Sequence, residues 1–211
     1  MGSHPRRLDG LRDDEQVAAR LVERATGATA WAHDVGRRQG AYDVHLTYPG
    51  GRTAALEVTT YAGSSSRNGM ALLGRGRLSA PPARHPARRP GRPRSAGTQS
   101  PPAVDRPGSV DPALAILPDA VSVLLAVPHV ARRAAKVAAA HRVDERHLLV
   151  GIGEGGLPGP LYLRLGSALV APPADAPELP VGLTHLWLTT EWPGSPLVAW
   201  DHARGWRSHQ V

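Results

Sequence analysis

Residues 41–61, AYDVHLTYPGGRTAALEVTTY, contain two runs of alternating apolar and polar residues on either side of a short turn sequence. Alternation with a period of two is typical of a β-strand that packs one face against a core. The intervening Pro49, Gly50 and Gly51 are strong turn formers. The stretch therefore predicts a β-hairpin, with one strand over residues 41–48 and the other over residues 53–61.

The length of this turn also predicts which residues face each other. A three-residue loop places Tyr48 opposite Arg52 and, counting outward, Asp43 opposite Glu57 on the polar face. Directly opposed side chains have Cβ atoms about 4.5–5.5 Å apart, and like charges at that distance are destabilising unless something neutralises them. A divalent cation would do so, and carboxylate oxygens are ligands that Mg²⁺ favours. We therefore expect a magnesium site at Asp43 and Glu57.

The residues before the hairpin predict a helix and one further strand. Apolar residues recur at helical spacing over residues 17–25, after Asp13, and Gln16 completes a sequence that resembles a capping box. Gly27 is expected to end this helix. Residues 29–35 then have the composition of a short strand.

The second half of the chain predicts two helices followed by three strands. The expected helices span residues 114–127 and 129–142, the expected strands span residues 147–152, 185–189 and 197–200, and residues 158–180 are expected to be mostly loop. The order of the predicted elements along the chain is one helix, three strands, two helices and then further strands. This order favours an α/β fold, in which a mixed β-sheet is flanked by helices.

One helix and two strands carry a pattern that resembles the PD-(D/E)xK, or restriction-endonuclease-like, nuclease superfamily. The pattern consists of Glu15 on the helix, Tyr42 and Asp43 on the first strand, and Glu57, Val58 and Thr59 at the end of the second. The resemblance covers roughly residues 12–61. It implies a restriction-endonuclease-like core with its N-terminal half over residues 1–62, an insertion over residues 63–110, and its C-terminal half over residues 111–211.

The resemblance also implies a reaction, namely Mg²⁺-dependent hydrolysis of DNA phosphodiester bonds. Asp43 and Glu57 would bind the ion, and Glu15 would complete the acidic cluster. Thr59 stands where the family has a lysine, and threonine carries no positive charge. Lys136 is the only lysine in the chain, and we expect it to replace the missing side chain from a neighbouring helix.

Two other interpretations of these residues remain open. In the first, the hairpin is simply amphipathic, and Asp43 and Glu57 are surface residues on a solvated face. In the second, a nuclease-like fold has lost catalysis together with its motif lysine. Such a protein would act as a DNA-binding or protein-interaction module.

Residues 63–110 differ in composition from the rest of the chain. Between residues 67 and 106 there are nine Arg and one acidic residue, a net charge of +8, whereas the whole chain carries +7. Frequent Pro and few apolar residues predict disorder. Arg92 lies in a Gly-Arg-Pro sequence that resembles the AT-hook, and Arg88, Arg89 and Arg94 surround it. We expect these four arginines to contact DNA, with affinity that falls as salt rises. The alternative is a compositional linker without a partner.

Composition limits the other kinds of site. The chain has no Cys, so it can form neither disulfides nor thiolate metal sites, which favours a reducing, cytoplasmic location. No apolar run reaches the ~18 residues of a membrane span. Glycine-rich residues 151–156 lack a GK[ST] or GxGxxG pattern, so we expect no nucleotide cofactor. The histidines are scattered, with no pair at ligand spacing on one predicted helix or turn. Oligomeric state is not indicated.

The core must be built without phenylalanine, since the chain has none. Leu, Val and Ala are therefore expected to supply most of the buried surface. Trp187, Trp200 and Trp206 fall on or beside the last predicted strands. We expect these three indole rings to fill the core.

Overall fold

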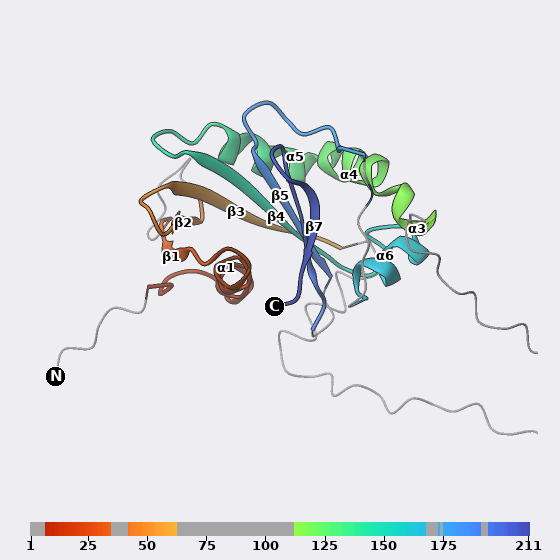
Figure 1. Cartoon of the computed structure of the whole chain (residues 1–211), viewed down its shortest axis with the longest axis horizontal. Coiled ribbons are helices and arrows are strands. Elements are labelled where there is room, and N and C mark those ends of the chain that lie inside the picture. The colour runs from red at the N-terminus through yellow and green to blue at the C-terminus, as the bar shows by residue number, and fades with distance from the viewer. Residues whose placement is uncertain (1–6, 35–41, 63–111, 168–172, 174, 191–193) are drawn as a thin grey trace, which may run out of the picture.

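The computed structural model of the chain describes residues 7–34, 42–62, 112–167, 173, 175–190 and 194–211 (Figure 1). They form one seven-stranded β-sheet whose strands lie side by side in the order of the chain. Helix α1 (Asp13–Thr26) packs on one face, and helices α4 (Leu117–Ala126) and α5 (Pro128–Ala138) pack on the other. The predicted α/β fold, a mixed sheet flanked by helices, is confirmed.

The sheet has a parallel centre and antiparallel margins. Strands β1 (Thr29–Ala32), β2 (Val44–Thr47) and β3 (Thr53–Tyr61) pair antiparallel. In the centre, β3 is parallel to β4 (Glu145–Ile152), and β4 is parallel to β5 (His185–Thr190). At the other margin, β5, β6 (Leu197–Asp201) and β7 (Gly205–His209) pair antiparallel. Central parallel strands are covered on both faces. Residues 54–59 of β3 are accordingly all buried, polar and apolar alike.

The β2–β3 turn has the predicted length. The Tyr48 N–H donates to the Arg52 carbonyl at 2.9 Å, and the Gly51 N–H donates to the Tyr48 carbonyl at 3.1 Å. Gly50 and Gly51 have φ of 95° and 87°, a left-handed conformation that glycine adopts without steric cost. The turn therefore has a conformation that requires these two residues.

The register of the hairpin is also as predicted. The ladder pairs Thr47 with Thr53 and Val44 with Leu56. One further step along the same register places Asp43 opposite Glu57. The β2 strand itself is shorter than predicted, because regular pairing begins only at Val44.

Helix α1 begins and ends with distinct caps. The predicted cap of Asp13 with Gln16 is wrong by one residue, since Arg12 is the N-cap and Glu15 completes the capping box. The Glu15 carboxylate accepts the Arg12 N–H at 2.9 Å and the Arg12 Nε at 2.8 Å. Gly27 ends the helix with φ of 72°, as predicted.

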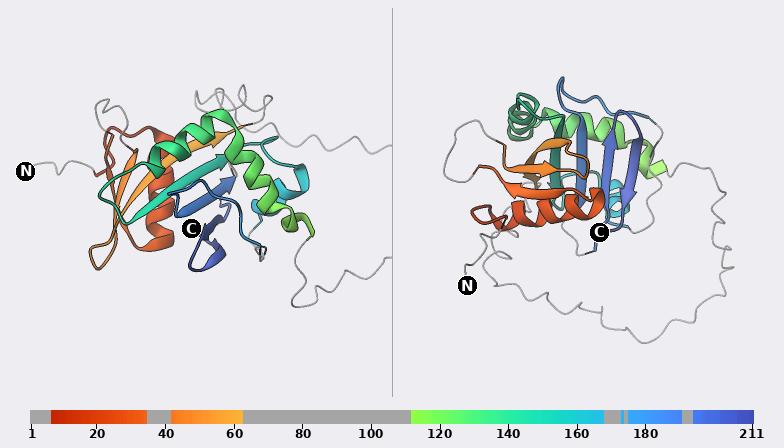
Figure 2. Two further views of the ribbon diagram at one scale, coloured as in Figure 1. Left: turned by 90° about the horizontal axis from the view of Figure 1, so that it is seen from above. Right: turned by 60° about the vertical axis from the view of Figure 1, so that its left-hand side comes forward.

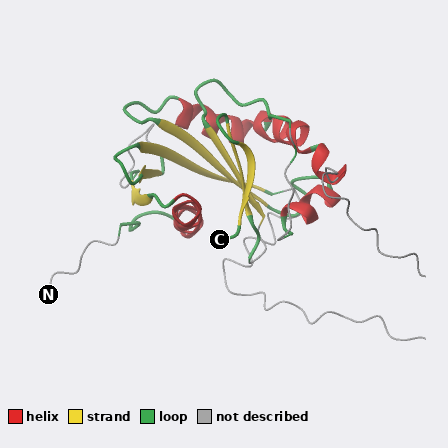
Figure 3. Ribbon diagram, viewed as in Figure 1, coloured by secondary structure: helices red, strands yellow, loops and turns green. Residues whose placement is uncertain are grey.

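The helices between β3 and β4 are more divided than predicted (Figure 3). The single helix expected over residues 114–127 is two, α3 (Pro112–Ala115) and α4. Pro118 lacks the N–H that a continuous helix would need, so α4 starts afresh around it. Helix α5 ends at Ala138 rather than near residue 142, and Arg142 has a positive φ of 59°.

Two elements were absent from the sequence prediction. Helix α6 (Gly159–Leu165) lies within the predicted loop, where Gly and Pro obscure a short helix that buries Leu161, Tyr162 and Leu165. Strand β7 buries only Trp206 among its five residues, so it has no apolar alternation to reveal it.

Helices cover both faces of the sheet (Figure 2), and a hydrophobic core lies on each face. Connections between parallel strands are almost always right-handed. The connections from β3 to β4 and from β4 to β5 advance in the same direction across the sheet, so their helices lie on the same face. Helices α3, α4, α5 and α6 accordingly share a core that includes Trp200 and Trp206. Helix α1 and Trp187 belong to the other core. All three tryptophans are buried, as predicted.

The predicted disordered segment, with Arg88, Arg89, Arg92 and Arg94, lies outside the described residues. Within the described part of the chain no single helix is long and apolar enough to cross a membrane; residues 113–126 and 128–138 pass that test only as a pair bent by 88°.

Candidate active site

The Asp43 side chain is fixed immediately before β2. Its Oδ2 accepts the backbone N–H of Val58 at 2.9 Å, a buried hydrogen bond between neighbouring strands. Its own backbone carbonyl accepts the N–H of His33 at 3.0 Å. These two contacts orient Asp43 across β3 and leave its Oδ1 directed towards the face that α5 covers.

Glu57 lies in the middle of β3, on the same face as Asp43. Glu57 is 0% exposed and Asp43 is 5% exposed, so the interpretation of both as solvated surface residues is wrong. The pKa of Glu57 is raised by burial first and by the negative charge of Asp43 second. Two buried carboxylates this close require cations beside them.

Helix α5 supplies those cations from one face, at positions 133 and 136. Lys136 Nζ lies 2.9 Å from both Glu57 carboxylate oxygens and 3.5 Å from Asp43 Oδ1. Arg133 Nη1 lies 2.5 Å from Glu57 Oε1 and 3.9 Å from Asp43 Oδ1. The structure thus brings Asp43, Glu57 and Lys136 together, as the sequence predicts, and adds Arg133, which the sequence analysis did not identify.

The four side chains form an electrically neutral cluster of two carboxylates and two cations. Burial alone would lower the pKa of Arg133, but Glu57, Asp43 and Glu15 outweigh it and the pKa is raised. Both cations also oppose the rise in the pKa of Glu57. A metal ion binding here would therefore compete with Arg133 and Lys136 for the same oxygens.

Glu15 lies at the border of this cluster. Both of its carboxylate oxygens bond to Arg12, so its direct role is to cap α1. Its charge still reaches Arg133. Thr59 is buried and lines a neighbouring cavity.

Glu57 Oε2 retains capacity for a further ligand. It is buried and accepts no hydrogen bond from the described residues, because its 2.9 Å contact with Lys136 is an ion pair without hydrogen-bond geometry. Together with Asp43 Oδ1, it provides the oxygen donors that a hard divalent cation prefers. The residues present therefore fit Mg²⁺.

A polar cavity of about 380 Å³ adjoins the acidic pair. It is lined by cationic residues and by the end of β3, namely Arg12, Val58, Thr59, Thr60, His129, Arg132 and Arg133. His129 is held there by a 3.0 Å hydrogen bond to the Thr60 carbonyl. Arg133 both lines the cavity and pairs with Glu57, so it stands between the cavity and the carboxylates.

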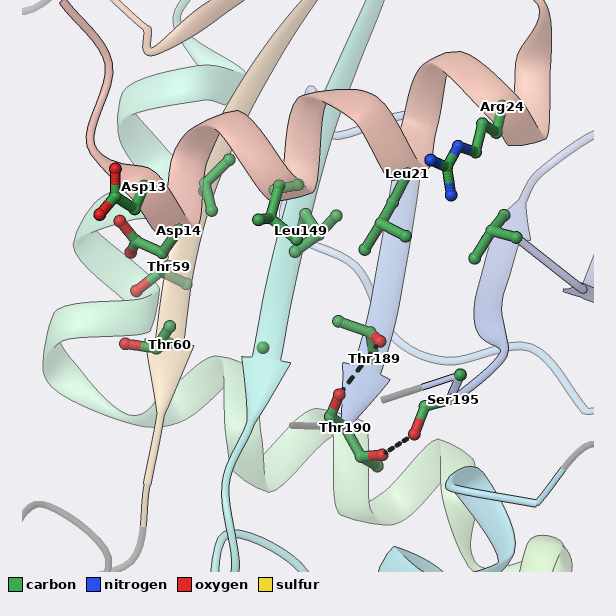
Figure 4. Close-up of a pocket in the computed structure, with 16 residues that line it drawn as sticks. Asp13, Asp14, Leu21, Arg24, Thr59, Thr60, Leu149, Thr189, Thr190 and Ser195 are labelled. Atoms are coloured by element: carbon green, nitrogen blue, oxygen red, sulfur yellow. Dashed lines mark hydrogen bonds between the residues drawn. The ribbon is translucent and has the colours of Figure 1, made fainter. Parts of the chain in front are cut away.

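A larger cavity, of about 540 Å³, lies between α1 and the sheet (Figure 4). Its lining is mainly apolar and hydroxyl-bearing, including Leu21, Leu149 and Thr189, with Asp13 and Asp14 at the start of α1. The hydroxyls of Thr190 and Ser195 are joined there at 2.6 Å. The two cavities share Val58, Thr59 and Thr60, so they meet at the end of β3.

A second group of metal-ligand side chains lies on the opposite face of the sheet. Glu145, His147 and His185 could hold a metal ion, since one ligand atom from each lies within 4.8 Å of the others. His147 is fully buried, and its Nε2 is 3.1 Å from Glu145 Oε2. This group is not predicted from the sequence, because the pairing of His147 with His185 across β4 and β5 depends on strand register. A local sequence signal for it is Glu145-Arg146-His147, which places two ligand types on one strand face.

Comparisons with protein-family models, with curated proteins and with solved structures found no match.

Proposed function

We propose that the chain is a Mg²⁺-dependent nuclease of the PD-(D/E)xK type, which hydrolyses DNA phosphodiester bonds at Asp43 and Glu57. One observation carries the proposal. Lys136, the only lysine in the sequence, reaches the acidic pair from α5, while Thr59 occupies the motif position. A helix-borne lysine in that place is the replacement that the family resemblance requires.

Each side chain has a distinct role in this proposal. Asp43 and Glu57 would hold the cation, which when bound would lower the pKa of a water ligand and neutralise charge on the phosphate. Lys136 keeps a positive charge beside the attacking water. Arg133 turns from Glu57 towards the cavity it already lines, and there it pairs with the phosphate.

The two adjoining cavities suit the rest of such a substrate. The cationic one, with Arg12, Arg132 and His129, favours the phosphate backbone. The larger one offers apolar and hydroxyl groups to an uncharged sugar or base. Arg88, Arg89, Arg92 and Arg94 would add contacts to DNA from the arginine-rich segment.

One observation favours a second candidate, a DNA-binding protein without catalysis. Arg133 and Lys136 together already neutralise the two carboxylates, so the site has no net negative charge to attract Mg²⁺. In that case the acidic pair is structural. DNA binding would then depend on the basic cavity and the arginine-rich segment.

Plasmid cleavage in Mg²⁺ separates the two candidates. The wild type should nick DNA, whereas Asp43→Asn with Glu57→Gln should bind DNA without nicking it. Asp119→Asn with Glu178→Gln removes two exposed carboxylates and serves as the matched control. Equal nicking by all three proteins would refute the nuclease assignment. Retained binding without nicking in every protein would support the non-catalytic candidate.

Two substitutions of Lys136 then test its role. Lys136→Met removes the charge, and Lys136→Arg keeps it but cannot exchange a proton at neutral pH. Loss of cleavage in both variants indicates proton transfer. Recovery in the arginine variant indicates that charge alone is required, and full activity in the methionine variant would contradict the proposed role.

A deletion tests the arginine-rich segment as a DNA-binding element. Removing residues 67–106 should weaken DNA binding and reduce its salt dependence, because fewer counterions are released. An unchanged affinity and salt slope would assign the segment to a linker.

A further inference from the structure

A small basic pocket lies on the α1 face of the sheet, where β4 begins. Its volume is about 120 Å³, and the residues that decide its chemistry are Arg52, Glu145, His185, Arg204, Arg207 and His209. The nuclease carboxylates lie on the other face, since Leu56 and Val58, the neighbours of Glu57, belong to the α1-side core. This basic pocket is therefore separate from the proposed active site.

Positive charge predominates in the basic pocket. Three guanidinium groups line it, against the single carboxylate of Glu145. That carboxylate is already bonded, with Arg52 Nη1 at 2.7 Å on Oε1 and His147 Nε2 at 3.1 Å on Oε2. Arg207 pairs through Nη2 with Asp201. The acidic groups are thus occupied, and Arg204 adds a further exposed cation.

Two side-chain nitrogens of residues that line this pocket make no hydrogen bond with any described residue. They are Arg207 Nε and His209 Nε2, both shielded from solvent. An arginine Nε–H can only donate, and a histidine Nε2 donates when it carries the proton. Buried donors without an acceptor are costly, so they indicate a missing acceptor.

The hydrogen bonds of His147 argue against a metal ion as the ligand. Its Nδ1 accepts the indole N–H of Trp187 at 3.1 Å, so the ring proton must sit on Nε2 and point at Glu145. A metal ion on Nε2 would need that proton to move to Nδ1, where it would meet the Trp187 N–H. Three neighbouring guanidinium groups would also repel a cation.

We propose that the basic pocket binds a phosphate-class oxyanion. Arg204, Arg207 and His209 would donate to it, and Arg52 would contribute charge from the β2–β3 turn. The volume equals roughly four water molecules in the liquid, which suits a tetrahedral ion of five heavy atoms. Burial, Arg207 and Arg204 lower the pKa of His209, so a bound anion would raise it.

Titration with inorganic phosphate, monitored at the Trp187 indole N–H by NMR, tests the proposal. Trp187 lines the pocket, and Trp187→Phe assigns its resonance. The wild type should show saturable shifts and a rise in the pKa of His209. Arg204→Gln and His209→Gln should each weaken binding at least tenfold. The Arg204 backbone is held by Asp201 Oδ1 at 2.8 Å, so the turn does not depend on its side chain.

Arg20→Gln, an exposed arginine on α1, is the matched control and should bind phosphate as the wild type does. Equal binding by all variants, or no saturation in the wild type, would overturn the site. So would stoichiometric Zn²⁺ binding that requires His147 and His185. A 5′-phosphorylated oligonucleotide that competes better than its unphosphorylated form supports the site and identifies a strand end as the source. If phosphate binds and neither oligonucleotide competes with it, the site is supported and its ligand is free phosphate.

Discussion

Removing the positive charge of Lys136 should expose the energetic coupling within the acidic cluster. Lys136→Met keeps most of the side-chain volume but leaves Glu57, which is fully buried, with less compensation. Breaking a buried ion pair from one side costs about 3–5 kcal/mol. Because the Lys136 side chain is 20% exposed and Arg133 remains beside Glu57, we expect the free energy of unfolding to fall by about 3 kcal/mol, the lower end of that range.

A double-mutant cycle separates this coupling from general disruption. In Glu57→Gln the buried charge is gone, so adding Lys136→Met should cost about 2 kcal/mol less than it does in the wild type. Urea unfolding at pH 7 measures all four proteins, with Arg20→Met as a surface-cation control expected within about 0.5 kcal/mol of wild type. Costs that add within about 0.5 kcal/mol would refute the coupling.

Three further predictions concern pH and buried polar groups. Burial and the charge of Asp43 raise the pKa of Glu57. Its favourable contribution to the free energy of unfolding is therefore complete below about pH 4.3 and is lost as the pH rises through the raised pKa. Glu57→Gln should consequently gain stability relative to wild type on going from pH 4 to 8. The hydrogen bond from His147 and the charge of nearby histidines outweigh burial and lower the pKa of Glu145 to about 2. The stability that Glu145→Gln loses relative to wild type should therefore be constant above about pH 5 and shrink towards pH 2. A loss of stability that does not change with pH would contradict this. Trp187→Phe removes the donor to buried His147 and should cost about 1–3 kcal/mol by urea unfolding, and a cost near zero would indicate that water replaces it.

The hairpin and the acidic pair could be predicted from sequence because their information is local. Turn length and strand alternation together set the pairing of Asp43 with Glu57, and Gly50 and Gly51 mark the turn. The burial of the pair could not be predicted in the same way. It depends on α5, which is distant in sequence and packs over a face that looks solvated in the strand pattern.

Cooperation between distant elements explains the remaining differences. Arg133 lies one helical turn before Lys136, yet its contact with Glu57 depends on how α5 crosses β3. The approach of His147 to His185 depends on a parallel register that no local signal specifies. Helix α6 and strand β7 are held by packing on neighbours rather than by their own periodicity.

Binding of Mn²⁺, followed by electron paramagnetic resonance, tests most directly whether Asp43 and Glu57 form a divalent cation site. Mn²⁺ suits the same carboxylate oxygens as Mg²⁺. The wild type should bind one Mn²⁺ ion per chain, and Asp43→Asn with Glu57→Gln should bind none. Arg133→Gln should bind Mn²⁺ about tenfold more tightly than the wild type, because a competing cation is gone. Tenfold corresponds to about 1.4 kcal/mol of binding free energy. Indistinguishable Mn²⁺ binding by these three proteins would contradict the proposed site.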